Sequence, residues 1–252
     1  MKALYSLSIL AAAVAVLTLS MPAHAGKMDS RIETSAKQSY VFKTYLQADD
    51  IKIQSKDGAV TLTGIVSENF HKSLAQETVA GLPGVRSVDN RLEVKGAPPT
   101  ANSDAWLRDK VKVALLFHRS VSARTTEVDV KGGIVTLRGE AASQAQKDLA
   151  TEYAKDAEGV KEVKNEMTVS QATKKTSRTI GEKIDDASIT AQVNMTLLNH
   201  RSTSVLNTSV KTKHGVVTVG GKARNTAEKA LVTKLVTDIN GVTGVRNRMT
   251  IE

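Results

Sequence analysis

The sequence predicts an α+β protein of three tandem αββαβ domains, each a small three-stranded mixed sheet covered on one face by two helices. Two repeated phrases predict this fold class. A glycine-centred phrase occurs three times, as DGAVTLTG from Asp57, GGIVTLRG from Gly132 and HGVVTVGG from His214. A closing phrase of the form GVxxVxN follows each copy at one fixed distance, from Gly84, Gly159 and Gly241. Because a repeat at constant spacing marks a repeated folding unit, each pair of phrases is expected to define one domain.

Each unit is predicted to begin with a helix and a β-hairpin. In the second copy, Leu107, Val111 and Leu115 recur at i, i+4 and i+8, which places them on one face of an α-helix. A short strand, a glycine turn and a second strand follow, which is the pattern of a hairpin. Glycine serves the turn because it reaches positive φ without a Cβ clash. The first copy is expected to be shorter than the others between its first helix and its first strand.

The second helix of each unit has the clearest periodicity. In the third copy, Leu231, Leu235 and Ile239 belong to one apolar stripe that faces a core. The helix is expected to end at the glycine of the closing phrase. The last strand alternates apolar and charged residues, so one face of the sheet is predicted to be covered and the other open to solvent. Because the second helix crosses over between neighbouring strands, those two strands are expected to run parallel.

These patterns divide the chain into six segments. They are a signal peptide (residues 1–25), domain 1 (26–95), a linker (96–103), domain 2 (104–170), a basic linker (171–185) and domain 3 (186–252). The signal peptide is predicted from the positive charge of Lys2, the apolar run Leu4–Leu19 and the small residues of Ala23–Ala25, which favour cleavage before Gly26. An apolar run of this length is short for a membrane-spanning helix.

The chain contains no cysteine. Disulfides, cysteine metal ligands and the acylated cysteine of a bacterial lipoprotein are therefore excluded. Together with the signal peptide, this composition predicts a soluble periplasmic protein that is not a lipoprotein and whose stability comes from packing.

The net charge of +9 is concentrated in the last third of the chain. Residues 171–252 hold thirteen Lys and Arg against six Asp and Glu. A basic surface favours anionic partners, and in an exported compartment anionic phospholipid is more available than nucleic acid. We therefore expect the partner to be anionic phospholipid or the outer-membrane surface, and no nucleic acid.

The sequence offers few candidates for catalysis or metal binding. HExxH, GxSxG and phosphate-loop motifs are absent, so the protein is expected not to be an enzyme and to use no cofactor or metal. His118 and His200 occupy equivalent positions at the ends of two first helices. They are interpreted either as a titrating or metal-binding pair, or as residues whose imidazole suits the last carbonyl groups of a helix.

One helix, DAWLRDKVKVALLFHRS, holds a candidate binding site. One of its stripes is turned by roughly 100° from the predicted core face. That stripe consists of Trp106, Lys110, Val113 and Phe117, and a third sector consists of Arg108, Lys112 and Arg119. Trp at the headgroup level, with cations beside an apolar stripe, is typical of a membrane interface. A contact with another protein or with a neighbouring repeat is the alternative.

The third copy has mostly polar residues on the same stripe. The equivalents are Ser188, Gln192, Met195 and Asn199. A core position should stay apolar in every copy, so the fold is predicted not to require apolar residues at Trp106 and Phe117. This comparison favours a surface that contacts lipid or a partner.

The repeated phrases resemble the BON domain, which is named for bacterial osmotically inducible and nodulation proteins. The DGxVxLxG-type strand and the GVxxVxN closure carry the resemblance, which covers nearly all of residues 30–252. The segments that start at Ser143 and Asp185 are similar to osmotically inducible periplasmic members of the family, in which two copies are usual.

This resemblance implies an αββαβ fold, no enzymatic activity and a role at the bacterial envelope. BON proteins are associated with phospholipid binding, outer-membrane maintenance, osmotic stress and chaperone-like action. In a two-domain outer-membrane lipoprotein of the family, the first helix of the second domain contacts lipid, and Trp106 matches a Trp there. The expected function is therefore that of a non-enzymatic periplasmic protein that binds anionic phospholipid in envelope maintenance or osmotic stress. The alternative is a chaperone-like or scaffold protein that binds unfolded polypeptide or envelope proteins.

Overall fold

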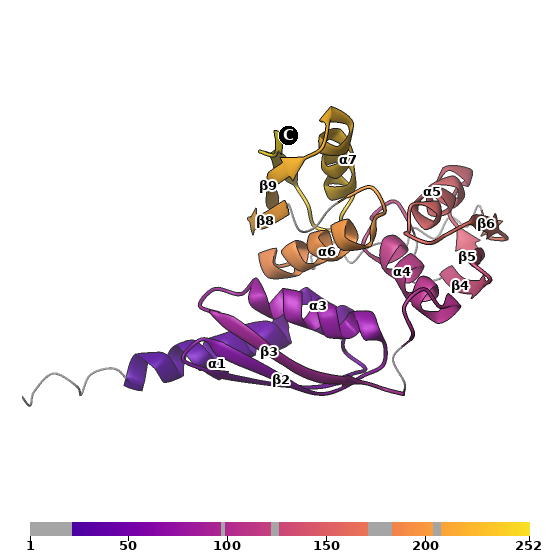
Figure 1. Ribbon diagram of the computed structural model, residues 1–252. Coiled ribbons are helices and arrows are strands. Elements are labelled where there is room, and N and C mark those ends of the chain that lie inside the picture. The colour runs from indigo at the N-terminus through magenta and orange to yellow at the C-terminus, as the bar shows by residue number, and fades with distance from the viewer. Residues whose placement is uncertain (1–21, 97–98, 122–125, 171–182, 204–207) are drawn as a thin grey trace, which may run out of the picture.

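A computed structural model of the chain describes residues 22–96, 99–121, 126–170, 183–203 and 208–252. Within these residues the chain forms three mixed sheets, each accompanied by helices from its own repeat (Figure 1). The predicted fold class of three tandem αββαβ domains is confirmed. The predicted signal peptide as far as residue 21, and residues 171–182 of the predicted basic linker, lie outside the described residues.

Domain 1 begins with a helix that is interrupted at Ser39. Its elements are α1 (Pro22–Gln38), α2 (Tyr40–Thr44), β1 (Asp50–Lys56), β2 (Ala59–Val66), α3 (Asn69–Ala80) and β3 (Ser87–Val94). The Ser39 hydroxyl accepts a hydrogen bond from the Phe42 amide and so caps α2. β1 and β2 form an antiparallel hairpin, and β2 and β3 are parallel, as the crossover helix α3 requires.

Domains 2 and 3 repeat this order with the last strand divided in two. Domain 2 consists of α4 (Asp104–Leu116), β4 (Thr126–Lys131), β5 (Ile134–Ala141), α5 (Gln144–Lys155), β6 (Glu162–Asn165) and β7 (Thr168–Val169). Domain 3 consists of α6 (Asp186–Asn199), β8 (Thr208–Lys213), β9 (Val216–Ala223), α7 (Thr226–Thr237), β10 (Gly244–Asn247) and β11 (Thr250–Ile251). In both domains the middle strand pairs antiparallel with the first strand and parallel with the last.

The asparagine that ends each closing phrase ties the last strand to the second helix. The side-chain amides of Asn90, Asn165 and Asn247 donate hydrogen bonds of 2.9, 2.8 and 2.8 Å to helix carbonyl groups, those of Lys72, Lys147 and Lys229. Each asparagine oxygen also accepts a hydrogen bond from the backbone amide two residues further on. One side chain thus satisfies polar groups of both the strand and the helix, which explains why the phrase ends on the same residue in each copy.

An aspartate at each first helix holds the hairpin turn. The carboxylates of Asp29, Asp104 and Asp186 accept hydrogen bonds from the backbone amides of Gly58, Gly133 and Gly215. Each aspartate precedes its glycine by the same 29 residues. The whole span from the first helix to the hairpin turn is therefore equally long in the three domains.

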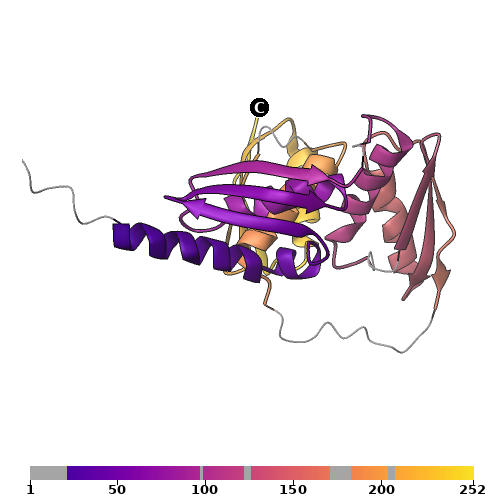
Figure 2. The same ribbon diagram turned by 90° about the horizontal axis from the view of Figure 1, so that it is seen from below.

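Helix α6 of domain 3 lies at the centre of the three domains. Figure 1 shows α6 running along α3 of domain 1, with α4 of domain 2 nearby, and both helices contact it. The Asp185 carboxylate accepts a hydrogen bond of 2.8 Å from the Tyr40 amide of α2. The side-chain amide of Asn194 donates one of 2.7 Å to Glu77 of α3. Figure 2 shows the sheet of domain 1 on the outer side of this helical layer.

Leu137→Ala should lower the free energy of unfolding by about 2–5 kcal/mol, because truncating a buried leucine removes apolar burial and leaves a cavity. Leu137 lies on β5 and has no exposed surface. Leu198→Ala is the control and should change stability little, since that side chain is 54% exposed. Urea unfolding followed by circular dichroism measures both variants, and equal losses would contradict the placement of the domain 2 core.

Candidate functional site

Trp106 packs on its own domain and stays partly open to solvent. Its ring lies beside Gly159 of the closing phrase, where an added Cβ would be 3.9 Å from it. The ammonium group of Lys110 lies 4.2 Å from the centre of the ring and pairs with Glu158 at 2.7 Å. Trp106 and Lys110 therefore cover the closing phrase of domain 2.

The other half of the predicted stripe is buried. Val113 and Phe117 are 1% and 0% exposed, and both belong to an apolar core that they share with domains 1 and 3. The Phe117 ring meets Tyr45 of domain 1 edge-on, with 5.5 Å between the ring centres. The Phe117 carbonyl accepts a hydrogen bond of 3.0 Å from the Asn240 amide of domain 3. The prediction of an exposed apolar stripe is wrong for these two residues, because the neighbouring domains cover them.

Two of the predicted cations also serve domain contacts. Lys112 pairs with Glu68 of domain 1 at 2.9 Å. The guanidinium group of Arg119 donates to backbone carbonyls of domain 3, those of Thr237, Ile239 and Val242. Helix α4 thus connects domain 1 to domain 3, which is the contact with neighbouring repeats that the sequence offered as the alternative to a membrane.

Trp106, Arg108 and Lys110 are the predicted site residues that reach solvent beside the domain contacts. The side chain of Arg108 is 44% exposed and lies 3.5 Å from the Asp109 carboxylate. Burial raises the pKa of Asp109, and the neighbouring Glu68 carboxylate adds to this effect. The part of the predicted site that is open to solvent and makes no hydrogen bond or ion pair with another domain within the described residues is therefore confined to the first two turns of α4. Lys112 and Arg119 are partly exposed as well, but they are engaged with domains 1 and 3.

The polar counterparts on α6 are buried as well. The residues are Ser188, Gln192, Met195 and Asn199, and each is at most 8% exposed. Gln192 donates a side-chain hydrogen bond of 3.1 Å to the Ser188 carbonyl, one turn earlier. A polar side chain at a domain interface can therefore find a hydrogen-bond partner in the backbone of its own helix, although Oε1 of Gln192 has none within the described residues. For this reason the comparison between copies is wrong as an argument for a free surface.

Domains 2 and 3 meet in a junction that is built twice from equivalent residues. The Arg119 amide donates a hydrogen bond of 2.8 Å to the Asp238 carbonyl. The Arg201 amide donates the equivalent bond of 3.0 Å to the Asp156 carbonyl. Both members of each pair lie 82 positions from their counterparts. The junction therefore has approximate two-fold symmetry.

This junction brings together the two histidines that the sequence singled out. The imidazole of His118 lies 3.2 Å from the Asp238 carboxylate, and that of His200 lies 3.5 Å from the Asp156 carboxylate. Both histidines line one small cavity of about 10 Å³. The two aspartates were not identified from the sequence as partners of the histidines. The signal that could have identified them is their spacing, because each aspartate follows the histidine of its own repeat by the same 38 positions.

The pKa values at the junction follow from its burial and hydrogen bonds. Burial lowers the pKa of His200, against the opposing effect of Asp156. Burial also raises the pKa of Tyr153, whose hydroxyl donates a hydrogen bond of 2.7 Å to Asp238. Although burial opposes it, hydrogen bonds from His118, Ser120 and Tyr153 hold the pKa of Asp238 below its usual value.

The outer face of the domain 3 sheet carries a basic patch. The patch consists of Lys211, Lys213, Lys222, Arg246 and Arg248, all exposed. Lys211 and Arg246 both pair in register with Thr218, so they lie in one row across the three strands. The apolar neighbours Val210 and Val245 pack against the core, which directs these cations to the opposite face.

The equivalent face of domain 2 has no such excess. Its charged residues are Glu127, Asp129, Lys131, Arg138, Glu140, Glu162, Lys164 and Glu166. Arg138 is paired with Glu166 at 2.9 Å. In the basic patch, Lys222 has a distant partner in Glu252 at 3.8 Å, and the described residues offer the other four cations no ion pair within 4.0 Å. The same fold therefore carries a mixed face in domain 2 and a basic one in domain 3.

Neither a metal centre nor a membrane span is found in the described part of the chain. No group of three or more His, Asp or Glu side chains there is arranged to hold a metal ion. None of the helices there is long and apolar enough to cross a bilayer.

The BON domain pattern matches the chain three times, at residues 28–96, 103–171 and 185–252. The chain belongs to the BON domain family. Its three BON domains coincide with the three sheets and their helices. The matches also start close to Asp29, Asp104 and Asp186, the aspartates that hold the hairpin turns.

Two characterised relatives and one solved structure are similar to this BON protein. It is 32% identical to the osmotically inducible protein Y of Escherichia coli (strain K12) over 143 residues, 55% of this chain and 71% of that protein. It is 30% identical to a 21 kDa hemolysin of Actinobacillus pleuropneumoniae over 115 residues, 45% of this chain and 59% of that protein. The C-terminal domain of CdsD, a structural protein of the type III secretion system of Chlamydia trachomatis, is 15% identical, with a TM-score of 0.24 over 94% of this chain and 100% of that one. That structural likeness is too weak to carry an argument.

Phe117→Ala should lower the free energy of unfolding by about 3–5 kcal/mol, because it empties a site between three domains. Trp106→Ala should cost clearly less, since part of that side chain already faces water. Urea unfolding of the two variants under one set of conditions makes the comparison. A larger loss for Trp106→Ala would contradict the burial of Phe117 between domains.

Proposed function

We propose that this protein is a soluble, periplasmic, non-enzymatic protein that binds anionic phospholipid surfaces. The open face of the domain 3 sheet is the contact. The likeness to an osmotically inducible protein supports a role in envelope maintenance or osmotic stress. The single observation that carries the proposal is the basic patch on that sheet face, which domain 2 lacks although its fold is the same.

The geometry of the sheet suits a planar anionic partner. No helix of its own domain covers this face, so five cations can approach phosphate groups together. Neighbouring strands are spaced by about 4.8 Å, so Lys211 and Arg246 stand about 10 Å apart on either side of Thr218. Each cation close to an anionic bilayer contributes about 1 kcal/mol of binding free energy, and a shared face lets several contributions add.

The start of α4 is a second contact in this proposal. Trp106, with Arg108 and Lys110 beside it, has the amphipathic character of residues that sit at the level of lipid headgroups. Its part is smaller than the sequence suggested, because Val113 and Phe117 are buried between domains.

Lys213→Gln combined with Arg246→Gln should weaken binding to vesicles that contain phosphatidylglycerol. Removing two cations from the contact should cost about 2 kcal/mol, roughly 30-fold in affinity at low salt. Flotation of the mature chain with such vesicles, over a series of salt concentrations, measures this loss. The double variant should also depend less on salt than the original protein, since fewer screened charges remain.

The matched control is Lys131→Gln combined with Lys164→Gln. These residues occupy the equivalent positions of domain 2, 82 residues earlier, and the double change removes the same net charge. Binding should stay within about twofold of the original protein, since charges that lie more than a Debye length from the membrane are largely screened. Equal losses in the two double variants would show that net charge matters and the sheet face does not.

The alternative function is binding of unfolded polypeptide or envelope proteins. It would be supported by suppression of aggregation in the absence of lipid together with no flotation at low salt. That pair of results would overturn the phospholipid proposal.

A further inference from the structure

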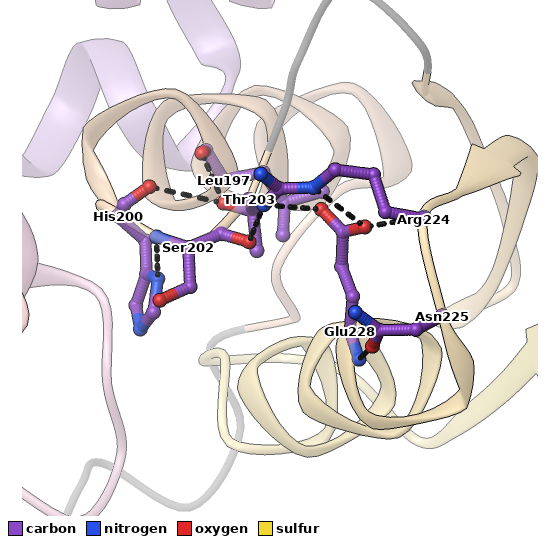
Figure 3. Close-up of polar contacts among 7 residues, drawn as sticks. All are labelled: Leu197, His200, Ser202, Thr203, Arg224, Asn225 and Glu228. Atoms are coloured by element: carbon purple, nitrogen blue, oxygen red, sulfur yellow. Dashed lines mark hydrogen bonds and ion pairs between the residues drawn. The ribbon is translucent and has the colours of Figure 1, made fainter.

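The junction between domains 2 and 3 contains a histidine whose surroundings oppose a second proton. Nδ1 of His200 accepts a hydrogen bond of 3.1 Å from the Ser202 backbone amide (Figure 3). The neutral ring therefore carries its proton on Nε2, which faces the Asp156 carboxylate at 3.5 Å. An imidazolium donates from both nitrogens. A proton on Nδ1 would thus meet the N–H of Ser202 and break this hydrogen bond.

The Ser202 amide is held in place from several sides. The Arg224 guanidinium donates a hydrogen bond of 3.1 Å to the Ser202 carbonyl and pairs with Glu228 at 3.2 Å. The Thr203 hydroxyl donates one of 2.5 Å to the Leu197 carbonyl of α6. Figure 3 shows these contacts converging on the turn that follows His200. Because these contacts hold the turn, the Ser202 amide cannot easily move away from a protonated Nδ1. Protonation of His200 therefore strains the closed junction.

His118 stands in a similarly closed environment. Its side chain is 1% exposed, and its ring stacks on Tyr153 with 3.8 Å between the ring centres. The Asp238 carboxylate that faces it already accepts hydrogen bonds from Ser120 and Tyr153. The charged groups beside His200 are Asp156 and Arg201. The charged and titratable groups beside His118 are Asp238, Arg119 and Tyr153. Each histidine is also a neighbour of the other. The His118 ring and the Arg201 guanidinium group are therefore close enough to His200 to oppose a positive charge on its ring.

We propose that this junction is an acid-sensitive latch. It holds domain 2 against domain 3 at neutral pH and releases it in mildly acidic solution. Release would uncover the part of this junction that each domain covers on the other, around His118 and Arg119 of domain 2 and His200 and Arg201 of domain 3. The latch rests on the geometry of the two histidines and does not depend on the phospholipid proposal.

The pH range of the latch follows from the shifted groups. The pKa of His200 is below the 6.5 of a free histidine, so the open state binds a proton more readily than the closed one. The junction is therefore fully stabilised above about pH 6.5 and weakens as the pH falls through the lower pKa of the closed state. The lowered pKa of Asp238 acts in the same direction, but only below the ordinary value of 3.8. Between pH 6.5 and pH 3.8, the protonation of His200 therefore controls the stability of the junction.

The chain lacks cysteine, so two introduced cysteines give unique positions for spin labels. Lys131→Cys in domain 2 and Lys213→Cys in domain 3 are exposed and distant from the histidines in sequence. The distribution of distances between the labels should be narrow at neutral pH, and it should shift and broaden in mildly acidic buffer. His118→Gln with His200→Gln should abolish this change, since glutamine can accept from the Ser202 amide and donate to Asp156 without titrating. His71→Gln is the control, because His71 pairs with Asp49 within domain 1 at 2.7 Å, and it should leave the pH response intact.

Hydrogen exchange of the unmodified chain gives a second test that needs no variant to fold. The amides of Arg119, Arg201 and Asn240 donate across the junction. After correction for intrinsic rates, their exchange should accelerate in mild acid, about tenfold for each unit by which the pKa of His200 is lowered. Amides of the domain cores should not accelerate with them. An unchanged label distance, or no selective change at these three amides, while circular dichroism shows the protein still folded, overturns the latch.

Discussion

The burial of helix α6 among three domains is the constraint on which the rest of the structure depends. Besides covering the sheet of its own domain, α6 has α3 of domain 1 along it and α4 of domain 2 beside it. Several of its buried polar side chains have partners, although Oε1 of Gln192 and Oγ1 of Thr196 have no hydrogen bond within the described residues. Ser188 accepts from the Val41 amide and donates to Asp185, which also accepts from Tyr40. The start of α6 therefore caps a helix of domain 1 as well as its own.

This packing changes which surfaces are available for function. The helical layers of the three domains face one another. Val113 and Phe117 of the predicted stripe on α4 are therefore buried in contacts between domains. The outer faces of the sheets remain, and only their charges distinguish them. Repetition of the fold thus supplies similar sheet faces, of which that of domain 3 is basic and that of domain 2 is mixed. The approximate two-fold junction between domains 2 and 3 is a second product of repetition, since it uses the same residues twice.

The sequence was sufficient for the fold within each repeat and insufficient for the contacts between repeats. Constant spacing of the glycine and GVxxVxN phrases located every sheet, because turns and crossovers depend on local geometry. The stripe of Trp106 and Phe117 was read correctly as apolar, but periodicity cannot distinguish a lipid from a neighbouring domain. The comparison between repeats failed at Gln192, because a buried polar side chain can donate a hydrogen bond to the backbone of its own helix. The charge of residues 171–252 was visible, whereas its concentration on one sheet face required the strand register.

Small-angle X-ray scattering of the mature chain at neutral pH tests the central claim most directly. If the three domains pack around α6, the distribution of interatomic distances has a single main peak and agrees with the curve calculated from the structure. If the domains are joined only by flexible linkers and do not pack together, the distribution is extended, with separate maxima for distances within and between domains. The second result would contradict the burial of Phe117 and the junction of His118 with Asp238 together.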